Sequence, residues 1–329
     1  MNEKLSVLIP VLNGAPFIAE AMESLERQTH RHFEVLAWDN GSTDDTLSIL
    51  KQWLPGRLPG HVFSDKPLSL GLSLRRLVEV APSELCARMD IDDVCHPDRF
   101  RKQLDFLREQ PGLAIVGTDR NYIDVDGNRV DGAMPVPNRP SDVLHGTLIG
   151  PNSLWHPTVM FRKSCILEVG NYQDHSTHDE PYWSEDYDLW MRLQSRHLGG
   201  ALPDRLLEYR INPVGVTQMA MREKRASLAR RRVWERNSAG FTGLPVASAM
   251  QLHGRTSRFA LPSLWHMAGF FSRLDKMSPF SRMKCPSFLE AISKLISRND
   301  FTSRLWIKAF KAVSAWTNQP APKDGQPRL

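Results

Sequence analysis

Short apolar runs alternate with segments of helical periodicity along the first 115 residues of the chain. Apolar runs of strand length occur at Leu5–Pro10, Phe33–Trp38, His61–Ser64 and Leu85–Met89. Helical periodicity covers Ala15–Gln28, Asp45–Trp53, Leu70–Val80 and Pro97–Gln110. Strands separated by helices predict an α/β domain, in which a mainly parallel, Rossmann-like sheet carries helices on both faces.

Polar residues cluster where three of these apolar runs end. The clusters are Asn13-Gly14, Asp39–Asp45 and Asp90–Asp93. In open parallel sheets, ligands bind beyond the carboxyl ends of the strands. The sequence therefore predicts one ligand site that these three clusters share.

The pattern changes after residue 114. It is mixed up to residue 212, with a hairpin signal at Asp126–Asn128 and a helix expected from Tyr187 to Arg196. Beyond Val216 the sequence becomes helical, basic and rich in Trp, and it ends in a Pro- and Gln-rich tail. We therefore predict an α/β domain at residues 1–215 and a basic, mostly helical region with a disordered tail at residues 216–329.

Charge is distributed unevenly between these two regions. From Val216 onward there are 20 Lys and Arg against 6 Asp and Glu, whereas the preceding part holds 22 against 31. Basic segments with Trp, such as Phe301–Trp316, suit an anionic membrane surface. The alternative is a solvated basic face that packs on the first domain. No nucleic-acid-binding motif accompanies the charge, so we expect no nucleic-acid partner.

Composition indicates a soluble globular protein, with 41% hydrophobic and 24% charged residues in 329. The four cysteines show no CxxC spacing, which indicates a reducing compartment. The first residues do not resemble a signal peptide, and no apolar run approaches the roughly 18 residues of a membrane span. We expect a cytoplasmic protein, with a peripheral position at the cytoplasmic face of the inner membrane if the basic region binds lipid.

Three carboxylates stand within four residues at Asp90, Asp92 and Asp93, directly after an apolar run. They repel one another unless a cation or basic groups offset their charge. A hard divalent ion, Mn²⁺ or Mg²⁺, prefers oxygen ligands and would neutralise charge on a departing phosphate. A solvated acidic turn that caps the helix near Pro97 is an equally weighted alternative.

The cluster after the second apolar run has two interpretations. Ser42 and Asp45 have the spacing of a capping box, so a helix cap is the favoured one. Asp39 differs, because a carboxylate at the end of a sheet strand can accept hydrogen bonds from a base N–H or a ribose hydroxyl.

Two acids, Glu185 and Asp186, precede the amphipathic helix near residue 187. The helix dipole favours acids there whatever their function, and spacing alone favours this explanation. The alternative is a general base that deprotonates an acceptor hydroxyl. His156 stands before another apolar run, and a lone His is more often structural than a phosphate or acceptor contact.

Six motifs follow one another in the chain: SVLIPVLNG, WDNGSTDDT, ARMDIDD followed by PDRF, HPTVMF, SEDYDLWMRL and LLEYRINP. Together they resemble the family 2 glycosyltransferases of the GT-A fold, from roughly Lys4 to Thr217. The resemblance implies an inverting enzyme that moves a sugar from a nucleotide-diphosphate donor, UDP- or dTDP-linked, to a hydroxyl of a saccharide or lipid-linked acceptor. By family analogy, the pathway is the assembly of cell-surface polysaccharide or lipopolysaccharide.

The resemblance also implies residue roles. Pro10, Asn13, Asp39 and Asp90 would lie at the nucleotide, Asp90 and Asp92 would form the metal-binding DxD pair with Asp92 in direct contact, and Asp186 would be the catalytic base with Glu185 beside it.

The chain departs from the family pattern at three places. Asn40 stands where many relatives have a second Asp, Asp65–Pro67 replaces Asn-x-Gly, and Asn212 stands where a His often follows Tyr-Arg. None of these removes the DxD pair or the base, so we expect an active enzyme.

Two rival functions are a nucleotidyltransferase and a non-catalytic scaffold that binds nucleotide sugar or membrane. The first would need a Gly-rich basic phosphate loop after the first strand, which Val11–Gly14 does not provide. The second is disfavoured by the intact Asp90, Asp92 and Asp186.

Overall fold

The structure, a computed structural model, describes residues 3–131, 154–176 and 184–213, together with residues 143, 147, 215, 229, 232, 233, 236 and 237. All of these residues belong to one compact unit. The domain boundary predicted after residue 215 lies at the edge of the described part and stays a prediction. The expectations for residues 238–329, including the membrane-binding segments, lie outside the described residues.

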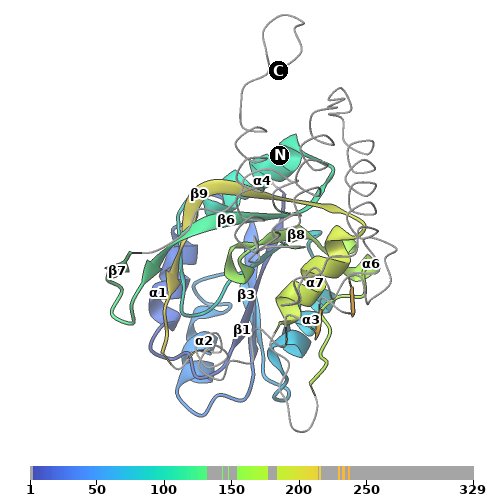
Figure 1. The fold of residues 1–329 in the computed structure, drawn as a ribbon. Coiled ribbons are helices and arrows are strands. Elements are labelled where there is room, and N and C mark those ends of the chain that lie inside the picture. The colour runs from blue at the N-terminus through green and yellow to red at the C-terminus, as the bar shows by residue number, and fades with distance from the viewer. Residues whose placement is uncertain are drawn as a thin grey trace, which may run out of the picture. The chain divides into compact units, whose positions relative to one another are not determined.

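A nine-stranded sheet forms the centre of this unit (Figure 1). Four neighbouring strands run parallel in the order β3 (Gly60–Phe63), β2 (Phe33–Asp39), β1 (Leu5–Val11) and β4 (Leu85–Arg88). The order continues with β8 (Met160–Arg162), β6 (Leu113–Ile123), β9 (Leu198–Arg210) and β5 (Val94–Cys95), and β7 (Arg129–Val130) pairs with β6. This second half is mixed, because β8 runs antiparallel to both β4 and β6 while β9 runs parallel to β6.

Helices cover both faces of the sheet, as Figure 1 shows. One core is formed with α1 (Ile18–Glu26), α2 (Thr46–Trp53) and α4 (Arg99–Glu109), and the other with α3 (Leu70–Val80), α6 (Lys163–Glu168) and α7 (Glu185–Gln194). Strand β1 contributes to both, since Val7 and Ile9 enter the first core and Leu8 the second. A strand buried on both faces favours a nearly continuous apolar run, which explains why Ser6 is the one polar residue of β1.

The predicted α/β fold with helices on both faces is confirmed, and several element boundaries differ. Helix α1 begins at Ile18 and not at Ala15, because the Phe17 N–H donates to the Gly14 carbonyl and closes a turn first. Helix α7 begins at Glu185, before the expected Tyr187. The expected hairpin turn is present, with the Asp124 N–H bonded to the Asn128 carbonyl ahead of β7. Within the described part, no helix has the length and apolar character needed to cross a membrane.

Candidate active site

The carboxyl ends of β1, β2 and β4 lie side by side at one edge of the sheet. In the parallel register Val11 pairs with Asp39, and Leu8 pairs with Arg88. The polar residues that follow each strand are therefore brought to the same edge. This confirms the shared location that the sequence predicted.

Hydrogen bonds join the loop after β1 to the loop after β2. The Asn13 N–H donates to Ser42 Oγ at 2.9 Å, and the Asn13 side-chain oxygen accepts from the Thr43 N–H at 2.8 Å. Asn13 adopts a left-handed backbone conformation, with φ 52°, which Asn tolerates better than most residues. The Ser42 hydroxyl in turn donates to Asp39, which is 4% exposed. Pro10 lies inside β1, opposite Trp38.

The capping-box interpretation of Ser42 and Asp45 is wrong. The N-cap of α2 is Asp45, and its side chain makes no capping hydrogen bond. Ser42 instead bonds to Asp39 and Asn13, and Asp44 accepts from the Thr46 N–H at 3.1 Å. The hydroxyl that seemed to serve the helix therefore orients the carboxylate of Asp39.

Asn40 anchors the loop that carries Asp65–Pro67. Its side-chain oxygen accepts from the Leu68 N–H at 3.3 Å, and its amide donates to Ser73 Oγ at 3.3 Å. Gly41 follows with φ +83°, and a Cβ there would lie 2.8 Å from the Pro67 ring. Asn40 and Gly41 therefore hold the chain at the end of the second departure, at Pro67 and Leu68.

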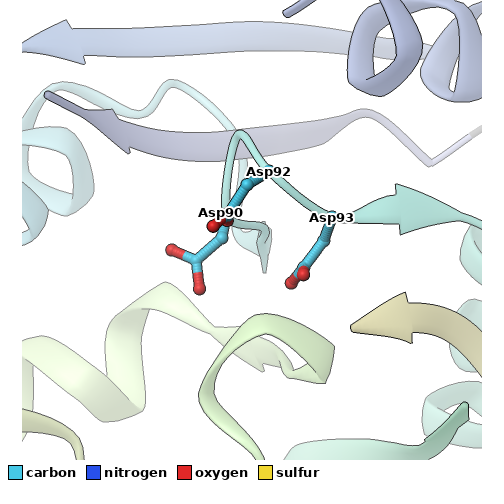
Figure 2. A group of neighbouring side chains, drawn as sticks. All are labelled: Asp90, Asp92 and Asp93. Atoms are coloured by element: carbon cyan, nitrogen blue, oxygen red, sulfur yellow. The ribbon is translucent and has the colours of Figure 1, made fainter. Parts of the chain in front are cut away.

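Three carboxylates gather on the turn between β4 and β5, and we call Asp90, Asp92 and Asp93 the acid turn (Figure 2). One side-chain oxygen from each lies within 4.8 Å of the others. Within the described residues, this is the one group of three or more His, Cys, Asp or Glu side chains close enough to share a metal ion. The alternative that these acids cap the following helix is wrong, because the N-cap of α4 is Asp98 and Asp93 Oδ1 instead accepts from the Arg210 N–H at 2.9 Å.

Two arginines and an asparagine border the acid turn. Arg88 Nη1 bonds to Asp90 Oδ2 at 2.5 Å, and Arg210 Nε donates to the Asp92 carbonyl at 2.8 Å. A side-chain hydrogen bond joins Asn212 to Asp92. The third departure from the family pattern therefore stands in contact with the predicted metal ligand.

Burial makes the acid turn reluctant to carry all its negative charge. It raises the pKa of Asp92 to about 6, with the charge of Asp90 as the second cause. Burial, followed by Asp90 and Asp92, also raises the pKa of Asp93 well above its usual value. Asp93 Oδ2 is buried and has no hydrogen-bond partner among the described residues. Hard oxygen ligands, one of them unpartnered, fit a divalent cation such as Mg²⁺ or Mn²⁺.

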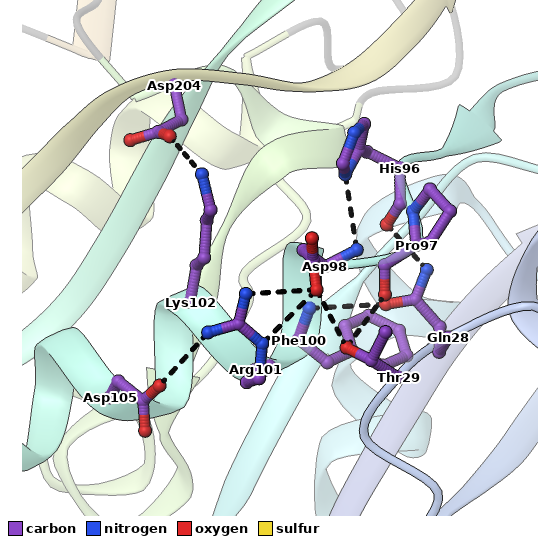
Figure 3. Close-up of polar contacts among 10 residues, drawn as sticks. All are labelled: Gln28, Thr29, His96, Pro97, Asp98, Phe100, Arg101, Lys102, Asp105 and Asp204. Carbon is purple, nitrogen blue, oxygen red and sulfur yellow. Dashed lines mark hydrogen bonds and ion pairs between the residues drawn. The ribbon is translucent and has the colours of Figure 1, made fainter.

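Hydrogen bonds join the chain just beyond the acid turn to Gln28 and Thr29, which follow α1, as Figure 3 shows. The Gln28 amide donates to the His96 carbonyl at 2.7 Å, and its oxygen accepts from the Phe100 N–H at 3.2 Å. The Thr29 N–H donates to the Pro97 carbonyl at 2.8 Å. These bonds fix the chain between the acid turn and α4.

The second acidic group stands at the start of α7. Glu185 and Asp186 occupy its first turn, where the helix dipole favours negative charge. Glu185 is only 8% exposed, and burial raises its pKa to about 8, with Asp186 as the second cause. The Asp186 side chain accepts from the Tyr187 N–H at 2.6 Å. At neutral pH Glu185 is therefore mainly protonated.

His156 lies in the interior beside this group. Its Nε2 is 2.9 Å from the Tyr172 hydroxyl, and its Nδ1 is 3.7 Å from Glu185 Oε1. Burial, with the charge of Arg88 second, lowers the pKa of His156 well below its usual value. The ring is therefore neutral at pH 7, and its placement against Tyr172 agrees with the structural interpretation. An acceptor or phosphate contact by His156 stays a prediction.

Sequence reasoning missed Arg88, Arg210 and Tyr172. A signal existed for Arg88, since a basic residue directly ahead of three acids is an obvious counter-charge. Nothing in the spacing could pair Arg210 with a turn 117 residues earlier.

Known proteins resemble this chain in sequence and in fold. The family model described as glycosyl transferase family 2 matches residues 6–165. The amylovoran biosynthesis glycosyltransferase AmsE of Erwinia amylovora is 30% identical over 209 residues, which cover 62% of this chain and 75% of that protein. An Escherichia coli UDP-Gal:alpha-D-GlcNAc-diphosphoundecaprenol beta-1,3-galactosyltransferase is 27% identical over 200 residues, covering 60% and 70%.

Solved structures share the fold. Staphylococcus aureus TarS 1–349 in complex with UDP-GlcNAc superposes with a TM-score of 0.58 at 18% identity, over 76% of this chain and 70% of that one. The mannosyltransferase PcManGT of Pyrobaculum calidifontis, in complex with GDP-Man and Mn²⁺, gives 0.55 at 16% identity, over 96% and 88%. The fold is the GT-A fold, and the chain belongs to glycosyltransferase family 2.

Proposed function

We propose that this chain is a metal-dependent, inverting glycosyltransferase that takes its sugar from a nucleotide-diphosphate donor. The observation that carries the proposal is the partly buried acid turn at the end of β4, beside the joined loops after β1 and β2. Arg88 links this turn to the second acidic group, because its charge acts on the pKa of both Asp92 and Glu185. The shared influence of Arg88 supports a proton-accepting site close to the donor site.

The donor side would hold the nucleotide diphosphate. Asp39, oriented by Ser42, offers a carboxylate to the base or ribose, and Asn13 and Pro10 border the same loop. Asp92 and Asp90 would hold the divalent ion, Mn²⁺ or Mg²⁺, which supplies positive charge against the departing diphosphate. Support for this assignment comes from the unpartnered Asp93 oxygen and from the family to which the chain belongs.

The acceptor side would move the proton. Asp186 accepts the proton of the acceptor hydroxyl while that oxygen attacks C1 of the sugar. The bond from C1 to the diphosphate breaks on the opposite face, and the configuration inverts. Glu185 is mainly protonated at neutral pH, so Asp186 is the carboxylate left to act as the base.

The acceptor and the pathway follow from the relatives. One of them is named for amylovoran biosynthesis, and another is named for transfer to a sugar on diphosphoundecaprenol. We infer a saccharide or lipid-linked acceptor in cell-surface polysaccharide or lipopolysaccharide assembly, with a UDP- or dTDP-sugar as donor. The basic residues after Val216 suit an anionic leaflet at the cytoplasmic face. Failure of the protein to float with anionic liposomes would remove the membrane part of this proposal.

Donor hydrolysis tests the central proposal. A panel of UDP-, dTDP- and GDP-sugars is incubated with Mn²⁺, Mg²⁺ or EDTA, beside the Asp92→Ala variant. We expect the unchanged protein to release nucleoside diphosphate from one of these donors, and only when metal is present. We expect no release by Asp92→Ala. Metal-independent nucleotide binding without hydrolysis, even with a panel of acceptors, would instead favour the scaffold.

A further inference from the structure

Arg88 is a buried cation fixed at the edge of the acid turn. It is the last residue of β4, and 3% of its side chain is exposed. Its N–H donates to the Val159 carbonyl at 2.9 Å, and its carbonyl accepts from Arg99 Nη2 at 2.7 Å. Both backbone groups are therefore engaged, and the guanidinium extends from an anchored position.

The guanidinium pairs with the acid turn at one point. Nη1 bonds to Asp90 Oδ2 at 2.5 Å, while the buried Nε has no hydrogen-bond partner among the described residues. The other arginine at the turn acts differently, because the side chain of Arg210 reaches the carbonyls of Asp92, Asp124 and Val125 and the carboxylate of Glu20. Among the residues that the structure describes, Arg88 is thus the cationic side chain that pairs with a carboxylate of the turn.

We propose that Arg88 is an internal counter-cation that keeps the affinity for a free divalent ion low, so that the metal binds together with the nucleotide diphosphate. This inference rests on the proposed metal site. A divalent ion and a guanidinium that share Asp90 repel one another, and the side chain of Arg88 is almost wholly buried beside Asp90. When the nucleotide diphosphate binds, its phosphate oxygens would provide the ligands that Asp90 cannot fully provide while it is paired with Arg88. Their negative charge would offset both the guanidinium and the divalent ion.

Coupling of this kind works in both directions. If UDP increases the affinity for Mn²⁺, then Mn²⁺ increases the affinity for UDP by the same factor. Arg88 is accordingly a positioning residue for the metal and the nucleotide, and it takes no part in the transfer step.

The test measures free Mn²⁺ by electron paramagnetic resonance during titration of the full chain, with and without UDP. For the unchanged protein we expect UDP to tighten Mn²⁺ binding at least tenfold. In Arg88→Met and Arg88→Gln, we expect nucleotide-free Mn²⁺ binding to tighten about tenfold, and the effect of UDP to shrink by a similar factor. Arg88→Lys keeps the charge and should stay close to the unchanged protein.

A matched control comes from a second buried pair. Arg120 bonds to Asp119 at 3.2 Å, with 3% and 4% of their side chains exposed, so Arg120→Met carries a comparable folding cost. We expect it to leave nucleotide-free Mn²⁺ affinity within twofold of the unchanged protein.

Three results would overturn the inference. First, the inference fails if the unchanged protein binds Mn²⁺ equally well with and without UDP, and this result does not require any Arg88 variant to fold. Second, it fails if Arg88→Met or Arg88→Gln binds Mn²⁺ in the absence of nucleotide no more tightly than the unchanged protein does. The second result would leave the proposed metal site intact. Absence of Mn²⁺ binding under both conditions removes the metal site itself.

Discussion

The two acidic groups of the candidate site each combine one buried carboxyl with partly exposed ones, but they are stabilised differently. In the acid turn, Asp90 bonds to Arg88, Asp93 accepts the Arg210 N–H, and Asp92 bonds to Asn212. At the start of α7, Glu185 accepts hydrogen bonds from its own backbone N–H and from that of Ser184, and it lies 3.7 Å from the neutral ring of His156. Two arginines contact the acid turn directly, whereas the charged group beside Glu185 is another acid, Asp186.

This difference assigns the two groups different chemistry. In the acid turn Asp90 is paired with Arg88, and a divalent ion would favour the ionised form of Asp92 and Asp93, whose pKa values burial raises. At α7, burial and the neighbouring Asp186 raise the pKa of Glu185, so that this carboxyl takes up a proton. Burial alone therefore cannot tell a metal ligand from a proton carrier, and the partners decide.

The largest expected effect separates the roles of the two groups. Asp186→Asn removes the proposed base, so we expect metal-dependent donor hydrolysis to fall by about 1000-fold, within the range for general bases. Mn²⁺ and UDP affinities should stay within threefold, because Asp186 belongs to the α7 group. Asp92→Asn is the contrasting variant and should lose both hydrolysis and Mn²⁺ binding. Equal loss of metal affinity in the two variants would abolish the distinction.

The next effect concerns stability and pH. Burial raises the pKa of Glu185 from 4.5 to about 8, so between these values the unfolded chain binds fewer protons than the folded protein. The free energy of unfolding therefore falls as pH rises through that window. Relative to Glu185→Gln, we expect the unchanged protein to lose about 3 kcal/mol between pH 5.5 and 8.0. Urea unfolding at both pH values measures this, with Glu168→Gln as an exposed control.

Parallel pH dependence of the unchanged protein and Glu185→Gln would show that Glu185 is ionised in the folded state. In that case Glu185 would be as available as Asp186 to accept a proton, and Asp186 would no longer be the better base. The comparison between the two groups would then fail on its acceptor side.

The parallel half of the fold could be predicted, because β1 and β2 are largely buried on both faces and are nearly continuous apolar runs, interrupted only at Ser6 and Glu34 before β2 ends at Asp39. Strands β6 and β9 were missed for the opposite reason. Both carry charged residues in the middle of the sheet, where Asn121 bonds to Glu208 and Arg205 lies 3.5 Å from Asp119. Such residues pair across strands, and no local pattern shows which partners they will meet.

In the candidate site, too, local sequence patterns predict positions but not the contacts between distant residues. Asn13, Asp39 and Asp92 could be located because polar residues at the ends of parallel strands share one edge. The charge state of each acid could not be predicted, because it depends on contacts with residues distant in the sequence, such as that of Asp93 with Arg210. Sequence positions locate the acids, and folding determines which of them keep their protons.

The smallest expected effect tests the donor-side packing at Asn40. Its amide donates to Ser73 Oγ, and the Ser73 hydroxyl already donates to the Leu70 carbonyl at 3.0 Å. Asn40→Asp restores the residue that many relatives carry, but it removes that donor and places a carboxylate oxygen against Ser73. We expect the free energy of unfolding to fall by about 1 kcal/mol.

A double-mutant cycle with Ser73→Ala makes this prediction specific. If the Asn40 amide and the Ser73 hydroxyl interact as the geometry indicates, the two changes should be non-additive by about 0.5–1 kcal/mol in urea unfolding. Simple additivity would mean that the contact contributes nothing, and that Asn40 is held through the Leu68 N–H alone. In either case the donor-side loop should prove far less sensitive to a change of charge than the α7 group, because Asn40 is partly exposed whereas Glu185 is enclosed.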